Sequence, residues 1–89
     1  MPRSFVKDPD AILDYEWDWS AWLGVDTIAS HTVTAATGLV VDTSEATTTA
    51  VTAWLSGGSV GQSYPVTCHV VTAAGREDDR TVTVTVMER

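Results

Sequence analysis

Near its C-terminal end the chain alternates between threonine and valine for six residues. Over residues 80–87 (RTVTVTVM), Val82, Val84 and Val86 share one face of an extended strand, while threonines occupy the other. On a helix the same valines would be scattered around the axis. β-branched residues favour strands, and the chain holds fourteen threonines and thirteen valines. The sequence therefore predicts an all-β fold.

Further strands are predicted from alternation or β-branched content at residues 13–19, 27–34, 39–42, 47–55 and 64–72. In the second of these, Ile28, Ser30 and Thr32 are expected on one face and Ala29, His31 and Val33 on the other. The expected connections are residues 20–26, 35–38, 43–46, 56–62 and 73–79, the last being a hairpin connection in which Gly75 can adopt positive φ. Short connections favour antiparallel neighbours. We expect a small antiparallel β-sandwich of six or seven strands, with a small β-barrel as the alternative.

A chain of 89 residues is long enough for one small domain. Residues 1–9 (MPRSFVKDP) contain two prolines and no clear period, so we expect an extended N-terminal arm, docked through Phe5 and Val6. Residues 10–89 are expected to form a single β-sandwich domain.

The composition argues against several classes of function. The formal net charge is −7, which leaves no basic patch for nucleic acid. Apolar runs are far shorter than the roughly 20 residues that span a bilayer, and residues 1–6 lack the apolar region of a secretory signal. Cys68 is the only cysteine, so no internal disulfide is expected. We expect no cofactor and no membrane association.

Four aromatic residues lie close together in the sequence: Tyr15, Trp17, Trp19 and Trp22. The favoured interpretation is that they belong to the core. The alternatives are contact with a protein partner, or a flat platform on which sugar rings stack, which requires at least two exposed, coplanar rings. Trp54 alternates with Val51, Ala53 and Leu55, so it is expected on the opposite side of its strand, exposed or at an interface.

Clustered carboxylates in a sequence suggest a calcium-binding site. However, the spacing of Asp8, Asp10, Asp14, Glu16 and Asp18 does not match a calcium loop, and a solvated outer face that discourages edge pairing is favoured over a metal site.

Residue types for catalysis are scarce. Cys68 and His69 are adjacent in one expected strand, so their side chains point to opposite faces and cannot form a dyad. Cys68 is expected to be buried and His69 to face solvent. Arg76 and Arg80 flank Glu77, Asp78 and Asp79, which favours surface ion pairs, with a partner-docking loop as the alternative.

Four stretches, in order, resemble small β-sandwich proteins of tailed-phage virions, the fibre–tail adaptor or related decoration proteins. They are residues 7–23 (KDPDAILDYEWDWSAWL), 26–28 (DTI), 54–58 (WLSGG) and 64–80 (YPVTCHVVTAAGREDDR). The resemblance implies an immunoglobulin-like sandwich with a structural, non-catalytic role. Tyr64, near the start of its strand, also resembles the tyrosine of the immunoglobulin F strand. In the immunoglobulin strand the tyrosine precedes a cysteine by two residues, whereas Tyr64 precedes Cys68 by four.

The resemblance implies a fibre–tail adaptor or a neck or tail accessory protein, without enzymatic activity. Such a protein is located in the virion after assembly in the bacterial cytoplasm, and contacts other virion proteins in several symmetric copies. The alternative is a carbohydrate-binding, adhesive or capsid-decorating immunoglobulin-like module. The residues expected to contact a partner are Phe5, Val6, Trp22, Trp54, Arg76 and Arg80.

Overall fold

The computed structural model describes the backbone of residues 3–7 and 11–87 and the side chains of Lys7 and residues 11–87. Helical segments in this part of the chain fall short of the length and hydrophobicity that a membrane span requires. The elements, in chain order, are β1 (Arg3–Lys7), β2 (Leu13–Asp18), α1 (Ser20–Leu23), β3 (Ile28–Ala35), β4 (Leu39–Ala46), β5 (Ala50–Gly57), β6 (Ser63–Thr72) and β7 (Glu77–Val86).

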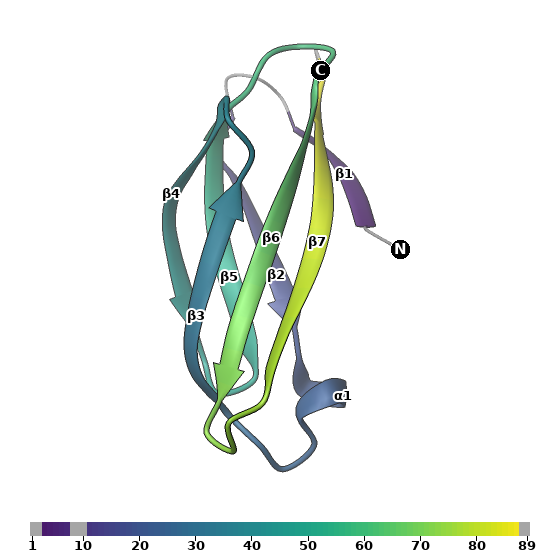
Figure 1. Ribbon diagram of the computed structural model, residues 1–89. Coiled ribbons are helices and arrows are strands. Elements are labelled where there is room, and N and C mark those ends of the chain that lie inside the picture. Colours follow the sequence, from purple (N-terminus) through teal and green to yellow (C-terminus); the bar gives the residue numbers. More distant parts are fainter. Residues whose placement is uncertain (1–2, 8–10, 88–89) are drawn as a thin grey trace.

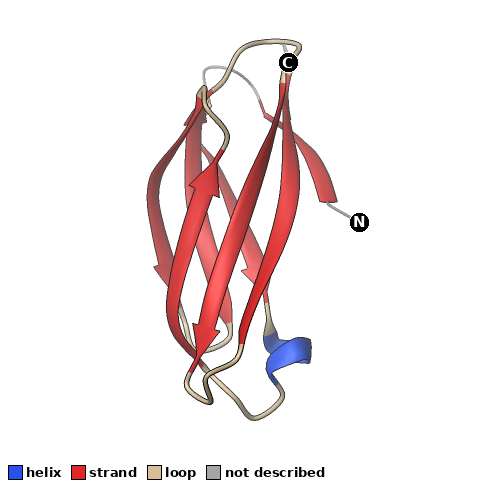
Figure 2. Cartoon of the chain, viewed as in Figure 1, coloured by secondary structure: helices blue, strands red, loops and turns tan. Residues whose placement is uncertain are grey.

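The strands form two layers (Figure 1). One sheet has the order β1-β7-β6-β3 and the other the order β2-β5-β4. Paired strands are antiparallel, except that β1 runs parallel to β7. Strands and short connections make up nearly all of the described chain (Figure 2). The predicted β-sandwich is confirmed, and the barrel alternative is wrong because the strands divide between two separate sheets.

The core is produced by the alternation that the sequence displays. Along β5, β6 and the C-terminal half of β7 every second side chain is buried. Burying one such valine or leucine contributes about 1.5–3 kcal/mol to the free energy of unfolding. The buried residues of these three strands, each at most 7% exposed, are Val51, Ala53, Leu55, Tyr64, Val66, Cys68, Val70, Thr72, Val82, Val84 and Val86.

The aromatic residues of β2 and α1, together with Trp19 between the two elements, belong to this core. Trp17 and Trp19 are buried, and Tyr15 and Trp22 are half-buried against the same cluster. The ring planes of Tyr15 and Trp17 meet at 78°, and those of Trp19 and Trp22 at 64°. The core interpretation is therefore confirmed. A sugar-stacking platform made of these rings is wrong, because none of the four is exposed and neither pair is coplanar.

Bulges shift the phase of two strands. In β3 the register changes between Ile28 and Ser30, so Ile28 packs against the core together with Val33, while Ser30 and Thr32 are exposed. The prediction that Ile28 shares a face with Ser30 is thus wrong. The bulge adds one residue and reverses the alternation that follows it.

Several expected boundaries are also wrong. Strand β5 spans Ala50–Gly57 rather than residues 47–55, and residues 47–49 lie in the turn that precedes it. Residues 43–46, expected as a connection, continue β4, which is the edge strand of its sheet and pairs with β5 as far as Ala46. Strand β7 begins at Glu77 rather than at residue 80. In the last two segments polar side chains suggested a loop, but backbone pairing does not require apolar side chains. Residues 20–26, expected as a turn, contain α1.

The expected arm, residues 1–9, contains β1. This strand pairs with the C-terminal half of β7, from Val82 to Val86. The Lys7 side chain is buried and donates a hydrogen bond from Nζ to the carbonyl oxygen of Gly57 (2.9 Å), which lies in the other sheet. The side chains of Phe5 and Val6 lie outside the described residues. The boundary between arm and domain remains a prediction.

Two glycines with positive φ provide a test of packing at the loop between β5 and β6. A Cβ on Gly58 (φ +92°) would lie 2.6 Å from Val86 Cγ2, whereas one on Gly61 (φ +85°) would meet nothing within 4 Å. Gly58→Ala and Gly61→Ala should each lose about 1–2 kcal/mol through the unfavourable φ. Gly58→Ala should lose about 1–3 kcal/mol more through overpacking. Urea unfolding measures both, and equal losses would contradict the packing described.

Candidate functional site

The connection from β2 to β3 and the hairpin from β6 to β7 lie together at one end of the sandwich (Figure 1). The backbone N–H of Ala73 donates to the carbonyl oxygen of Thr27 (2.9 Å), which joins the two connections directly. This region, residues 18–27 and 72–80, is named the hairpin end. It contains Trp22, Arg76 and Arg80, three of the six residues expected to contact a partner.

The helical turn α1 is specified by its flanking residues. Asp18 Oδ1 accepts a hydrogen bond from the backbone N–H of Ser20 (2.9 Å), and the N–H of Leu23 bonds to the carbonyl oxygen of Trp19 (2.9 Å). The turn ends at Gly24, which adopts a φ of +61°. The bond from the Ser20 backbone is the main cause that lowers the pKa of Asp18 below 3.8.

Asp26 is the polar centre of the hairpin end. Its Oδ1 accepts hydrogen bonds from the backbone N–H groups of Thr27 (2.8 Å) and Ala74 (3.1 Å), and its side chain is only 9% exposed. Its Oδ2 is 3.2 Å from Nε of Arg76. Together, a hydrogen bond from the Thr72 side chain and these contacts lower the pKa of Asp26 to about 2. The carboxylate thus joins the β2–β3 connection to the β6–β7 hairpin.

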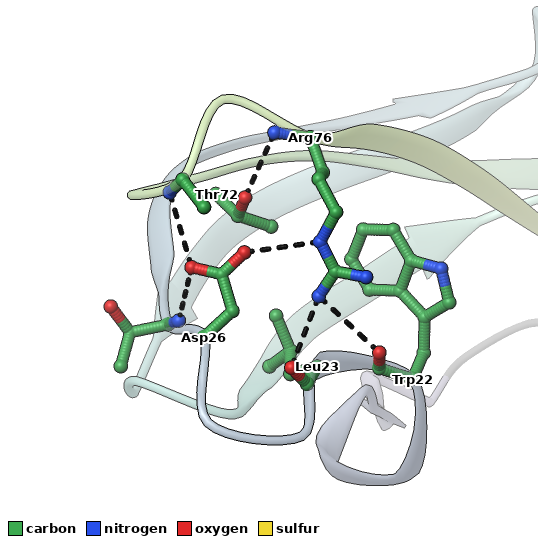
Figure 3. A network of polar contacts seen from close by, with 7 residues as sticks. Trp22, Leu23, Asp26, Thr72 and Arg76 are labelled. Carbon is green, nitrogen blue, oxygen red and sulfur yellow. Dashed lines mark hydrogen bonds and ion pairs between the residues drawn. The ribbon is translucent and has the colours of Figure 1, made fainter.

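Arg76 extends from the hairpin across α1 (Figure 3). One terminal nitrogen donates to the carbonyl oxygens of Leu23 (3.0 Å) and Trp22 (3.4 Å). The guanidinium carbon lies 4.4 Å from the centre of the Trp22 ring, a cation–π distance. The side chain remains 43% exposed. Arg76 therefore fixes the end of α1 while leaving part of its surface accessible.

Arg80 makes a similar pair of contacts with the start of α1. It donates to the carbonyl oxygen of Asp18 (2.9 Å), and its guanidinium carbon lies 4.2 Å from the centre of the Trp19 ring. The two tryptophan rings therefore pack against each other, and each also contacts one arginine. The expectation that Arg76 pairs with the neighbouring acids is wrong. Its carboxylate partner is Asp26, distant in sequence, whereas Glu77 and Asp79 contact His69.

The other expected contact residues lie elsewhere. Trp54 is half-buried in β5, on the side opposite the core, and pairs across strands with Asp14 and Thr43. The backbones of Phe5 and Val6 lie in β1 beside the C-terminal half of β7. The six residues therefore do not form one site, and their contact with a partner remains a prediction.

His69 lies on the outer face of β6 and contacts two carboxylates. Its Nδ1 bonds to Asp79, and its Nε2 lies 3.0 Å from Glu77 Oε1. When the ring is protonated, both nitrogens donate, and the contact with Asp79 is the main cause that raises the His69 pKa above 6.5. This contact was not predicted from the sequence, although pairing the two strands around Gly75 places His69 opposite Asp79.

Cys68 points the other way, into the core. Its thiol is buried, and desolvation raises the pKa to about 11. It cannot act with His69, because the two side chains lie on opposite faces of β6. Among the described side chains, no group of three or more His, Cys, Asp and Glu residues is placed to hold a metal ion. Asp8 and Asp10 lie outside the described residues.

The contacts of Asp26 predict a loss of stability in acid. Its pKa is about 2 in the folded chain against 3.8 in the unfolded one. Its contribution to stability is therefore present above pH 3.8 and lost as the pH falls toward 2. Asp26→Asn should lower stability at neutral pH and flatten the decline between these pH values, as measured by urea unfolding. Asp14→Asn, on an exposed residue, is the control. An unchanged acid decline in Asp26→Asn would contradict this role.

His69 predicts the opposite pH dependence. Because its pKa is raised in the folded chain, its contribution is complete below pH 6.5 and is lost as the pH rises through the folded pKa. His69→Gln should remove this decline in the melting temperature as the pH rises above 6.5. His31→Gln, which removes a contact with Ser44 (3.0 Å), is the control. Parallel pH profiles for wild type and His69→Gln would refute the assignment.

Comparison with known protein families identifies a match to this chain. The family model described as podophage GP4 fiber-tail adaptor protein gp77 matches residues 7–85. The match runs from the last residue of β1 almost to the end of β7 and includes the whole hairpin end. None of the curated proteins matches the chain. Because the family model covers most of the sequence, the chain belongs to the podophage fibre–tail adaptor family.

Proposed function

We propose that this chain is a non-enzymatic joint in the podophage virion, which contacts tail and fibre proteins through its strand faces, edges and loops. The observation that carries the proposal is the family match over residues 7–85. A joint must hold its shape under load, and the hairpin end has contacts suited to this. Asp26, Arg76 and Arg80 join the β2–β3 connection, which contains α1, to the β6–β7 hairpin and to β7.

We also infer that the sandwich is of the immunoglobulin type. The orders β2-β5-β4 and β7-β6-β3 correspond to B-E-D and G-F-C of that fold. A tyrosine contact supports the inference. The phenolic oxygen of Tyr64, at the start of β6, accepts a hydrogen bond from the backbone N–H of Ser59 (2.8 Å), five residues upstream. Immunoglobulin-like domains use an equivalent tyrosine to fix the corner before strand F.

The absence of enzymatic activity is supported by the nucleophile and base candidates. The Cys68 thiol is buried and has a pKa of about 11, so it is protonated at neutral pH. Both nitrogens of His69 contact carboxylates. Neither residue is placed to activate the other.

We further propose that each virion contains several symmetric copies of this chain and is assembled in the bacterial cytoplasm. A chain of 9.5 kDa offers a modest contact area. Copies arranged around a tail would act together, because linked contacts multiply the strength of each one.

A phage that lacks the gene for this chain tests the proposal. The mutant should assemble heads and tails, but its tails should carry no fibres in electron micrographs. Adding the purified chain to these particles should restore both the fibres and adsorption to cells. Full fibre occupancy without the chain would overturn the proposal, as would absence of the chain from purified virions.

A further inference from the structure

The outer face of the β2-β5-β4 sheet has an apolar centre. Trp54 of β5 lies on this face, flanked by Asp14 of β2 and Thr43 of β4. One row away, Val40 pairs with Ser56 and is 52% exposed. Ile12 directly precedes β2 and is 67% exposed. Strand alternation directs it to the side of Asp14, away from Leu13. Such exposed apolar groups on one face are typical of a contact surface.

Carboxylates surround this centre. Asp14, Glu16 and Asp18 are the exposed residues of β2, and Asp42 and Glu45 are exposed on β4. Asp42 is held toward the centre, because its Oδ1 accepts a hydrogen bond from the Ser56 hydroxyl (2.8 Å). Strands β2, β4 and β5 contain no lysine or arginine. This surface, named the acid-rimmed face, therefore combines an apolar centre with a rim of one charge sign.

The outer face of the other sheet differs in chemistry. Its strands β6 and β7 are joined by hydroxyl pairs, Thr67 with Thr81 (2.9 Å) and Ser63 with Thr85 (3.0 Å). Its carboxylates Glu77 and Asp79 are occupied by His69. The negative charge of the sandwich is thus concentrated on the acid-rimmed face, where Arg80 offsets part of the charge at Asp18, at the end of β2.

The negative charge of the acid-rimmed face limits which kind of partner can bind to it. Pairing with the same face of a second copy would bring carboxylates together, which costs free energy at any separation shorter than the screening length. A partner with lysine and arginine around an apolar depression would meet both the rim and the centre. Complementary charge also accelerates encounter between the two surfaces.

We propose that the acid-rimmed face docks a basic surface of a virion protein, with Ile12, Val40 and Trp54 as the apolar anchor. The inference rests on the proposed adaptor function and specifies which face makes the contact. Because the rim charges are exposed, the interaction weakens as salt rises, whereas the apolar anchor remains largely insensitive to salt.

Binding of the purified full chain to the tail and to the fibre of the same phage, each immobilised separately, tests the proposal. Asp14→Lys should weaken binding to one of these two about tenfold at low salt, with a smaller effect at high salt. Asp78→Lys changes the net charge equally but lies on β7, and should leave binding within about twofold. Ile12→Ser should weaken binding, whereas Val25→Ser, at the fully exposed Val25, should not.

Carboxyl footprinting tests the face without substitutions. In the complex, labelling of Asp14, Glu16 and Asp42 by carbodiimide should fall, while labelling of Asp78 should not change. Two outcomes would overturn the docking face and leave the adaptor function standing, provided that the wild-type chain binds. One is equal affinity of Asp14→Lys and Asp78→Lys for the partner. The other is unchanged labelling of Asp14 in the complex. Failure of the wild-type chain to bind either tail or fibre would overturn the adaptor function itself.

Discussion

The Trp19 ring lies in the interior between the two sheets and is completely buried. Its backbone N–H donates to the carbonyl oxygen of Thr49 (2.9 Å), which attaches the start of α1 to the turn between β4 and β5. One face of the indole supports the Arg80 guanidinium, and the Trp22 ring packs against it edge-on. Among the described residues, its Nε1 has no oxygen or nitrogen partner, and it lies near the Cys68 sulfur, a weak acceptor. The apolar burial of this one side chain must therefore offset a poorly satisfied N–H, and the hairpin end is built around it.

Much of the fold could be predicted from the sequence because side-chain alternation survives in the strands that form the core. Val82, Val84 and Val86, together with Trp17 and Trp19, are buried on the faces that alternation predicts. The errors have a local cause. A bulge inserts one residue without requiring a particular residue type, so the phase of β3 at Ile28 could not be derived from the sequence. The pairing of β1 with β7 joins opposite ends of the chain, and nothing near residues 3–7 specifies it.

The candidate site was less predictable, because its main contacts join residues far apart in sequence. Arg76 has acidic neighbours, which suggested local ion pairs, yet it contacts Asp26 fifty residues away. Only the pairing of the two connections brings these residues together. The separation of Cys68 from His69 was predictable, since adjacent residues of a strand face opposite sides. Trp54 was placed correctly on the outside of β5, but the carboxylates around it come from two other strands, and their arrangement depends on sheet order.

The single lysine of the sequence is buried at the end of β1, with its ammonium group against the Gly57 carbonyl oxygen. Amine-directed reagents therefore reach Lys7 only when β1 separates from β7. The rate at which Lys7 is acylated thus measures how often the first strand detaches from an otherwise folded domain. An amine reagent, normally used to map surfaces, would in this chain measure the rate at which one sheet edge opens.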